Sequence, residues 1–105
     1  MLLKPAAAIA SARRAGTTAT LDVLLKYFSF HQMPVVSSNY WNMVHGNTPD
    51  EVMQDKEGLQ IMHVLGKNMA WILHCLEAGK MPEFQNRQQR RRSKQILFVH
   101  NLRVD

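Results

Sequence analysis

The 105-residue sequence predicts an α/β fold built on a parallel sheet. Two observations support this class. Short apolar runs that suit buried strands alternate with longer segments whose apolar residues repeat at helical spacing. Each predicted strand is followed by a helix, and this order produces parallel strands joined by right-handed crossovers. We therefore expect both strands to end at the same edge of the sheet.

The first predicted strand covers residues 4–11 (KPAAAIAS). Its alanines would also suit a helix, but Pro5 and the short, bounded apolar run favour a strand that is buried on both faces. Residues 12–16 (ARRAG) follow as a loop, in which Gly16 is free to adopt a positive φ.

A helix is predicted next, capped by Thr17 or Thr18 and ending near Phe30. Its apolar face consists of Leu21, Leu24, Leu25 and Phe28, at i, i+3, i+4 and i+7. Pro34 stops the helix, and residues 33–37 (MPVVS) are predicted as a second short buried strand.

An aromatic loop, residues 37–49 (SSNYWNMVHGNTP), leads into a long helical pattern. Thr48 is the expected N-cap, Pro49 the first helical residue, and Glu51 completes a capping box. The pattern continues from about Asp55 to Ala78. Its apolar stripe consists of Leu59, Met62, Leu65, Met69, Ile72 and Leu76.

Five further residues of the long helix have structural interpretations. Gly58 and Gly66 cost helix propensity, so they are expected to allow close packing on a sheet or a partner helix. Cys75, the only cysteine, is expected to be a buried small apolar residue. His63 and His74 lack the carboxylate or cysteine spacing of a metal site, so no metal is predicted.

The positive charge is concentrated in the C-terminal tail. Residues 1–80 carry seven Lys/Arg and six Asp/Glu (7 − 6 = +1), whereas residues 81–105 carry six and two (6 − 2 = +4). We predict a domain over residues 1–80 and a solvated basic tail over 81–105, in which ILFV at 96–99 is either a small extra strand or a sticky segment. The tail has no recognised nucleic-acid motif, and no apolar run could span a bilayer, so neither partner is expected and a cytoplasmic location is predicted.

Two parallel strands are too few for a stable sheet, so the pattern indicates half of a doubly wound domain. Three segments, KPAAAIASARRAGTTATLDVLLKYF, MPVVSSNYWNMVHGNTPDEV and DKEGLQIMHVLGKNMAWIL, resemble the C-terminal half of a flavodoxin-like flavoprotein. The nearest branch is the NADPH-dependent FMN reductase and iron–sulfur-flavoprotein-like family, and the resemblance covers roughly residues 4–80. It implies a flavodoxin-like, doubly wound parallel sheet that is present as a partial domain and is completed by oligomerisation, so a homo-oligomer is expected.

The resemblance also implies FMN as cofactor, NAD(P)H as electron donor, and a site at the carboxyl ends of the strands. The predicted FMN-binding residues are Ser11, Ala12, Arg13, Arg14, Gly16, Thr17 and Thr18. The arginines suit a phosphate, and the turn and hydroxyls suit a polar ring edge. The alternative is a plain helix cap beside two solvated arginines.

The aromatic loop is expected to shape the acceptor side of the flavin through Tyr40, Trp41 and His45. The rings would stack on the isoalloxazine or on a quinone-like substrate, and the imidazole would hydrogen-bond or protonate a substrate carbonyl. The alternative is an aromatic plug that packs a dimer interface. No residue is predicted to act as a covalent nucleophile. At the level of the whole chain, the alternative to a flavin-dependent oxidoreductase is a non-catalytic, self-associating fragment that binds no flavin.

Overall fold

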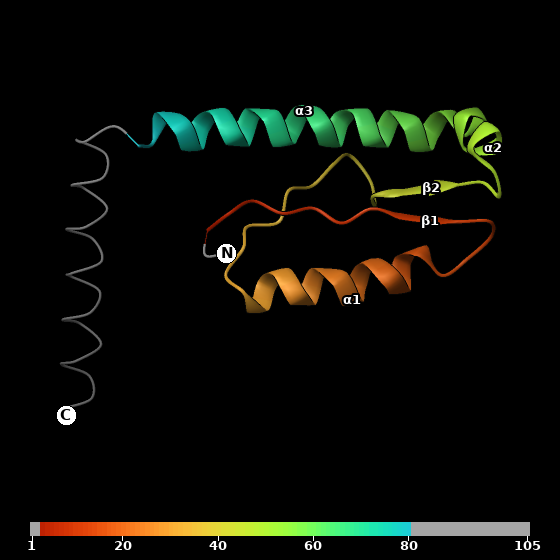
Figure 1. The fold of residues 1–105 in the computed structure, drawn as a ribbon, viewed down its shortest axis with the longest axis horizontal. Helices are drawn as coiled ribbons and strands as arrows, with labels where there is room; N and C mark the ends of the chain where they lie inside the picture. Colours follow the sequence, from red (N-terminus) through yellow and green to blue (C-terminus); the bar gives the residue numbers. More distant parts are fainter. Residues whose placement is uncertain (1–2, 81–105) are drawn as a thin grey trace, which may run out of the picture. The chain divides into compact units, whose positions relative to one another are not determined.

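The computed structural model describes residues 3–80 and contains two short strands and three helices (Figure 1). In chain order they are β1 (Ala10–Ala12), α1 (Thr17–Phe30), β2 (Met43–His45), α2 (Pro49–Gln54) and α3 (Lys56–Ala78). The chain divides into two compact units, Met1–Leu73 and His74–Asp105, and the sheet, α1, α2 and most of α3 belong to the first. The predicted tail, with its ILFV segment, lies outside the described residues.

The predicted α/β class with parallel strands is confirmed, because β1 and β2 form a two-stranded parallel sheet. Ala10 pairs with Met43, and the register continues to Ala12 beside His45. Upstream, Ala6 forms an isolated parallel bridge with Val35. The segment from Ala6 to Ala12 therefore pairs with Val35 at one end and with β2 at the other. This is the pairing of an extended strand and not of a helix.

The predicted second strand at residues 33–37 is wrong in position. Only Val35 pairs with the first segment, and the regular strand β2 lies at Met43–His45, within the segment predicted as the aromatic loop. The reason is that the chain leaves the sheet after Val36 to contact α3. Ser37 O accepts a hydrogen bond from Asn68 Nδ2 at 2.8 Å, and Ser38 Oγ donates to Ile61 O at 2.6 Å.

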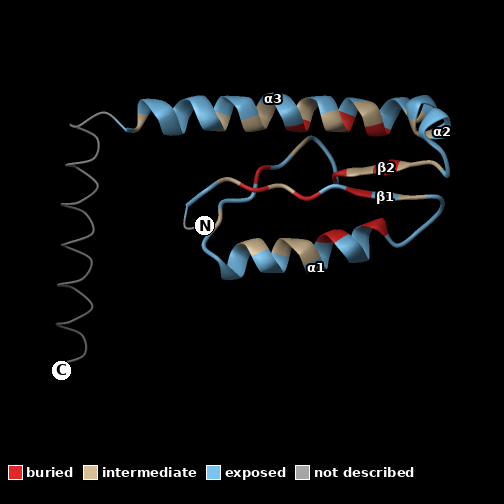
Figure 2. Cartoon of the chain, viewed as in Figure 1, coloured by how far each residue is buried: buried red, intermediate tan, exposed pale blue. Residues whose placement is uncertain are grey.

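Helix α1 lies along one side of β1, and both the strand and the first turns of the helix carry buried residues (Figure 2). Ala8, Ala10 and Leu21 form a buried cluster, against which Leu24 and Phe28 pack. The other side of the strand is less covered, since the side chain of Ile9 is 55% exposed. The prediction of a strand buried on both faces is therefore wrong, because only the face toward α1 is closed.

The cap of α1 also differs from the prediction. Gly16, with φ 92°, is the N-cap residue, and no side chain caps the helix. Thr17 is instead the first helical residue. The positive φ predicted for Gly16 is confirmed, and it allows the chain to turn directly from β1 into the helix.

Helix α3 lies on the opposite side of the sheet from α1 (Figure 1). Its buried residues are Gly58, Ile61 and Leu65. A Cβ on Gly58 would come within 2.9 Å of Val44 Cγ1, so the predicted close packing at this glycine is confirmed. At Gly66 a Cβ would meet nothing within 4 Å, so this glycine does not pack closely on the sheet, and the alternative of a partner helix stays a prediction.

The predicted apolar stripe of α3 is buried only in part. Leu65 is buried and Leu76 is 43% exposed. Trp71 and Leu73 are 69% and 50% exposed. Cys75 is also exposed, contrary to the prediction that it is buried. Among residues 3–80, no helix combines the length and the apolarity needed to cross a membrane.

Candidate functional site

The carboxyl ends of β1 and β2 lie side by side and bring two turns to one edge of the sheet. Ala12, the last residue of β1, is in register with His45, the last residue of β2. Ala12 O accepts a hydrogen bond from Gly46 N at 3.1 Å, which holds the start of the second turn against the start of the first. In parallel α/β sheets this edge is where ligands bind.

The turn after β1 exposes polar groups to solvent. Arg13, Arg14 and Gly16 are exposed, as is Ser11 just before them. The first three N–H groups of α1, from residues 17–19, have no acceptor among the described residues. A helix N-terminus of this kind carries partial positive charge and has donors free for an anion or a polar ring edge.

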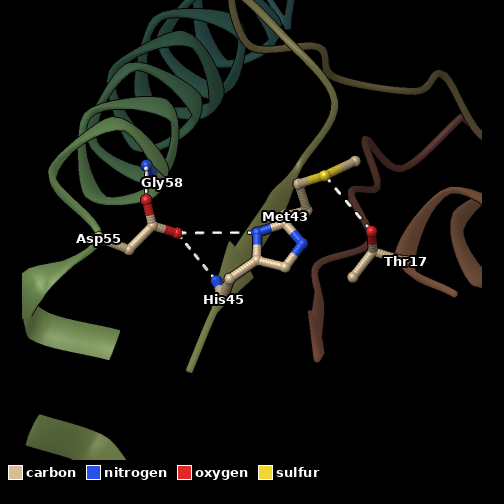
Figure 3. Close-up of polar contacts among 5 residues, drawn as sticks. All are labelled: Thr17, Met43, His45, Asp55 and Gly58. Carbon is tan, nitrogen blue, oxygen red and sulfur yellow. Dashed lines mark hydrogen bonds and ion pairs between the residues drawn. The ribbon is translucent and has the colours of Figure 1, made fainter. Parts of the chain in front are cut away.

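Thr17 has a different role from its neighbours. It is 5% exposed, and its Oγ1 donates to Met43 Sδ at 3.3 Å, which ties the start of α1 to β2 (Figure 3). Thr18 is exposed, so its side chain remains available to a ligand. The two threonines predicted to contact the cofactor therefore differ in exposure. Thr17 is buried and bonds to β2, whereas Thr18 is exposed to solvent.

The turn after β2 is closed by Asp55, as Figure 3 shows. One carboxylate oxygen of Asp55 accepts a hydrogen bond from His45 N at 2.8 Å, and the other accepts from Gly58 N at 2.9 Å. The Gly58 bond, followed by the His45 bond, lowers the pKa of Asp55. The carboxylate also lies 3.9 Å from His45 Nδ1, so Asp55 binds the backbone of His45 and lies near its ring.

A pocket of about 500 Å³ lies between α1 and the segment that connects Val35 to β2. Its size is in the range of small-molecule sites. Thr18, Tyr40 and Trp41 are the predicted site residues that line it. The two aromatic rings are tilted by 48° with centroids 6.2 Å apart, and both residues are more than half exposed. The other lining residues are Leu21, Asp22, Leu25, Val35, Val36, Ser37, Ser38, Asn39 and Asn42.

The structure therefore splits the predicted residues into two groups. The turn residues and His45 lie at the carboxyl edge of the sheet, whereas Tyr40 and Trp41 precede β2 and lie in the pocket wall. The expectation that Tyr40 and Trp41 follow their strand is wrong, because β2 begins after them. Thr18 is the one predicted residue of the first turn that lines the pocket.

Two residues of this region escaped the sequence analysis. Asp55 was treated only as the start of a helical pattern, although an aspartate three residues before Gly58 is a recognisable N-cap signal. Asn42 is buried, and its side chain donates to Ala8 O at 3.1 Å. Ala8 lies between the Ala6–Val35 bridge and the part of the segment that pairs with β2. No local pattern marks such a long-range bond.

Comparison with protein-family models, with curated proteins and with solved structures gave no match for this chain. Among residues 3–80, no three His, Cys, Asp or Glu side chains come together as a metal-binding group.

Proposed function

We infer that this chain is part of an FMN-dependent oxidoreductase and contributes the edge of the sheet that holds the flavin. The observation that carries this proposal is the turn after β1, which ends in Gly16 at positive φ and leaves the first N–H groups of α1 without acceptors among residues 3–80. The resemblance to the C-terminal half of flavodoxin-like NADPH-dependent FMN reductases selects FMN among possible anionic ligands. The proposed setting is the cytoplasm.

The residues of the turn fit the chemistry of the group. Arg13 and Arg14 are exposed and lie four and three residues before Thr17, the first residue of α1, so their charges can neutralise a phosphate near the helix start. The N–H groups of residues 17–19 can donate to phosphate or flavin oxygens. When bound, FMN would accept a hydride from NAD(P)H and pass electrons to a second acceptor, while the protein supplies position and electrostatics.

The pocket beside this turn is the proposed acceptor side. Tyr40 and Trp41 offer exposed rings on which a flat, quinone-like molecule can stack. Asp22 and Asn42 add polar groups to the lining. Thr18, in the first turn of α1, follows the loop after β1 and also lines the pocket. The proposed cofactor and acceptor regions are therefore adjacent at this residue.

His45 is proposed to hydrogen-bond the substrate from the end of β2. Asp55 faces Nδ1 of the imidazole at 3.9 Å, which leaves Nε2 as the nitrogen available to a ligand. The side chain is 41% exposed, so it is accessible from solvent.

Titration of the chain with FMN, followed by quenching of flavin fluorescence, tests the proposal. We expect saturable quenching with FMN and weaker binding of riboflavin, because riboflavin lacks the phosphate. The double variant Arg13→Glu/Arg14→Glu should weaken FMN binding by at least about tenfold, whereas Lys26→Glu, an exposed charge change farther along α1, should leave it unchanged. Absence of saturable quenching, alone and with a supplied N-terminal half of a flavodoxin-like protein, would contradict the proposal.

A second candidate is a self-associating module that binds no flavin, and one observation favours it. Twelve large apolar side chains are exposed in the described part of the chain, including Phe30 at 86% and Trp71 at 69%. Exposed aromatic and aliphatic side chains of this kind are enriched in the contact surfaces between protein chains. This candidate predicts association without any change in flavin fluorescence.

A further inference from the structure

We propose that the free edge of the first strand pairs with the same strand of a second copy of this chain. The two segments of residues 6–12 would run antiparallel about a two-fold axis, giving a four-stranded sheet in the order β2-β1-β1-β2. This inference does not rest on flavin binding, and its experiments are carried out without flavin.

Hydrogen bonding shows which edge of the segment is already used. Ala6 N donates to Pro34 O at 2.9 Å, and Ala6 O accepts from Val36 N at 2.8 Å. Farther along, Ala10 N donates to Asn42 O at 3.0 Å. Ala8 O and Ala12 O accept from Asn42 Nδ2 and Gly46 N. All of these partners lie on the side of β2, and all of the bonds come from even-numbered residues of the segment.

The odd-numbered residues therefore direct their backbone groups to the opposite edge, because successive residues of a strand point their N–H and C=O groups to alternate sides. These residues are Ala7, Ile9 and Ser11. In the part of the chain that the structure describes, the sheet order is β1-β2 and no strand pairs with this edge. The Ile9 side chain beside it is 55% exposed.

The edge also lacks the features that normally prevent pairing. Protected edges carry lysines, prolines within the strand, or bulges. Here no charged residue occurs between Lys4 and Arg13, and the one proline, Pro5, precedes the segment. A two-stranded sheet is marginally stable in water, so an unprotected edge that can gain further strands favours association.

A second copy fits this edge because the edge is complementary to itself. A two-fold interface places the same residues on both sides, and antiparallel strands satisfy that symmetry. With Ile9 opposite Ile9, all seven residues from Ala6 to Ala12 pair, and Ala8 lies opposite Ala10. The segment is neutral, so its approach to a copy of itself brings no charges together, and its small side chains allow the strands to meet without a clash. The two Ile9 side chains then cover each other on the face that α1 leaves open.

Sedimentation velocity over a wide range of concentrations tests the proposal. We expect a reversible dimer that Ile9→Lys weakens by at least about tenfold, because two like charges would stand opposite each other at the axis. Val23→Lys is the matched control, since Val23 on α1 is also 55% exposed. It should leave the dimer intact. A monomer at all concentrations, or a dimer that only Val23→Lys disrupts, would overturn the proposal.

Two further measurements detect the pairing directly and do not depend on the lysine variant. Amide hydrogen exchange should show the N–H groups of Ala7, Ile9 and Ser11 becoming protected as concentration rises. In a Cys75→Ser background, Ile9→Cys should form a disulfide-linked dimer, because directly opposed residues of an antiparallel pair lie within disulfide range. Unprotected amides together with an uncross-linked Ile9→Cys chain would show that the dimer uses another surface.

Discussion

The turns after β1 and β2 start from paired residues of the same sheet edge, yet they use their backbone donors differently. After β1, the N-cap is Gly16, no side chain caps α1, and the first helical N–H groups have no acceptor among the described residues. After β2, Asp55 accepts bonds from His45 N and Gly58 N, while Thr48 Oγ1 accepts from Glu51 N.

The difference shows which turn is available to a ligand. A donor that is satisfied within the protein has little to gain from a ligand, whereas an unsatisfied donor at a helix start attracts an anion. The turn after β2 lies at the end of the aromatic loop, but the N–H groups of His45, Glu51 and Gly58 are bonded within the protein. The turn after β1 has the N–H groups that remain available to a ligand. Substitutions confined to one turn test this contrast.

Asp55→Ala should have the largest effect on stability. The variant leaves the N–H groups of His45 and Gly58 without acceptors, and bonds to a charged group contribute about 1.5–3 kcal/mol each, with incomplete additivity. We expect the free energy of unfolding, measured by urea denaturation, to fall by about 3 kcal/mol.

The matched control is Asp50→Ala, which removes an exposed acid from the first turn of α2. It should cost only the interaction with the helix dipole, about 0.5 kcal/mol. If the two variants were equally stable, Asp55 would not be the residue that closes the second turn.

Gly16→Ala should be the next largest effect and should act on the first turn. A Cβ at Gly16 would meet nothing within 4 Å, but φ is 92°, where an L-residue is strained by about 1–2 kcal/mol. Gly66→Ala is the informative counterpart, because a Cβ there also meets nothing and the backbone is helical. It should stabilise the protein by about 1 kcal/mol. If thermal denaturation showed that both substitutions stabilise the protein, or that both destabilise it, this explanation would be contradicted.

Thr48→Ala should cost about 1 kcal/mol, the usual contribution of an N-cap hydroxyl. Thr18→Ala is the matched change in the first turn. Its hydroxyl is exposed and caps nothing, so stability should change by less than about 0.5 kcal/mol. A comparable loss in both variants, measured by urea denaturation, would show that the two turns do not differ as described.

These residues also show what the sequence reveals and what it hides. The start of α2 was predictable because it depends on neighbours in the chain, Thr48 with Glu51. At the start of α1 only the positive φ of Gly16 was expected, since the cap was predicted at Thr17 or Thr18. The position of β2 was not, because Ser38 and Asn68 divert the preceding segment through bonds that span 23 and 31 residues. The exposure of Ile9 was missed for a similar reason, since it depends on which faces of the sheet other elements cover.

The candidate site was predictable to a similar extent. The alternation of elements predicts parallel strands that end side by side, but it did not predict the pairing of Ala12 with His45, because the second strand was expected at residues 33–37. The predicted site residues are divided between the carboxyl ends of the strands and the pocket that Tyr40 and Trp41 line. This division depends on where β2 begins, and the same long-range bonds fix that position. The proposed roles of these residues remain predictions.

The pH dependence of stability gives the smallest expected effect and isolates the charge of Asp55. Its backbone bonds, first from Gly58 and then from His45, lower the pKa of this carboxyl below its ordinary value of 3.8. The unfolded chain therefore takes up the proton more readily than the folded one as the solution is acidified. The stabilisation is fully present well above pH 3.8 and is lost as the pH falls through the folded-state pKa.

Urea denaturation of the wild type and Asp55→Asn at a series of acidic pH values measures this contribution. The difference in stability between them should be constant near neutrality and should shrink toward low pH, because asparagine cannot ionise. The effect is smaller than that of Asp55→Ala, since a protonated carboxyl still has an acceptor oxygen and the side chain is 22% exposed to solvent. A difference that grows on acidification would mean that the folded protein favours the protonated form, and that the second turn is not held by a carboxylate.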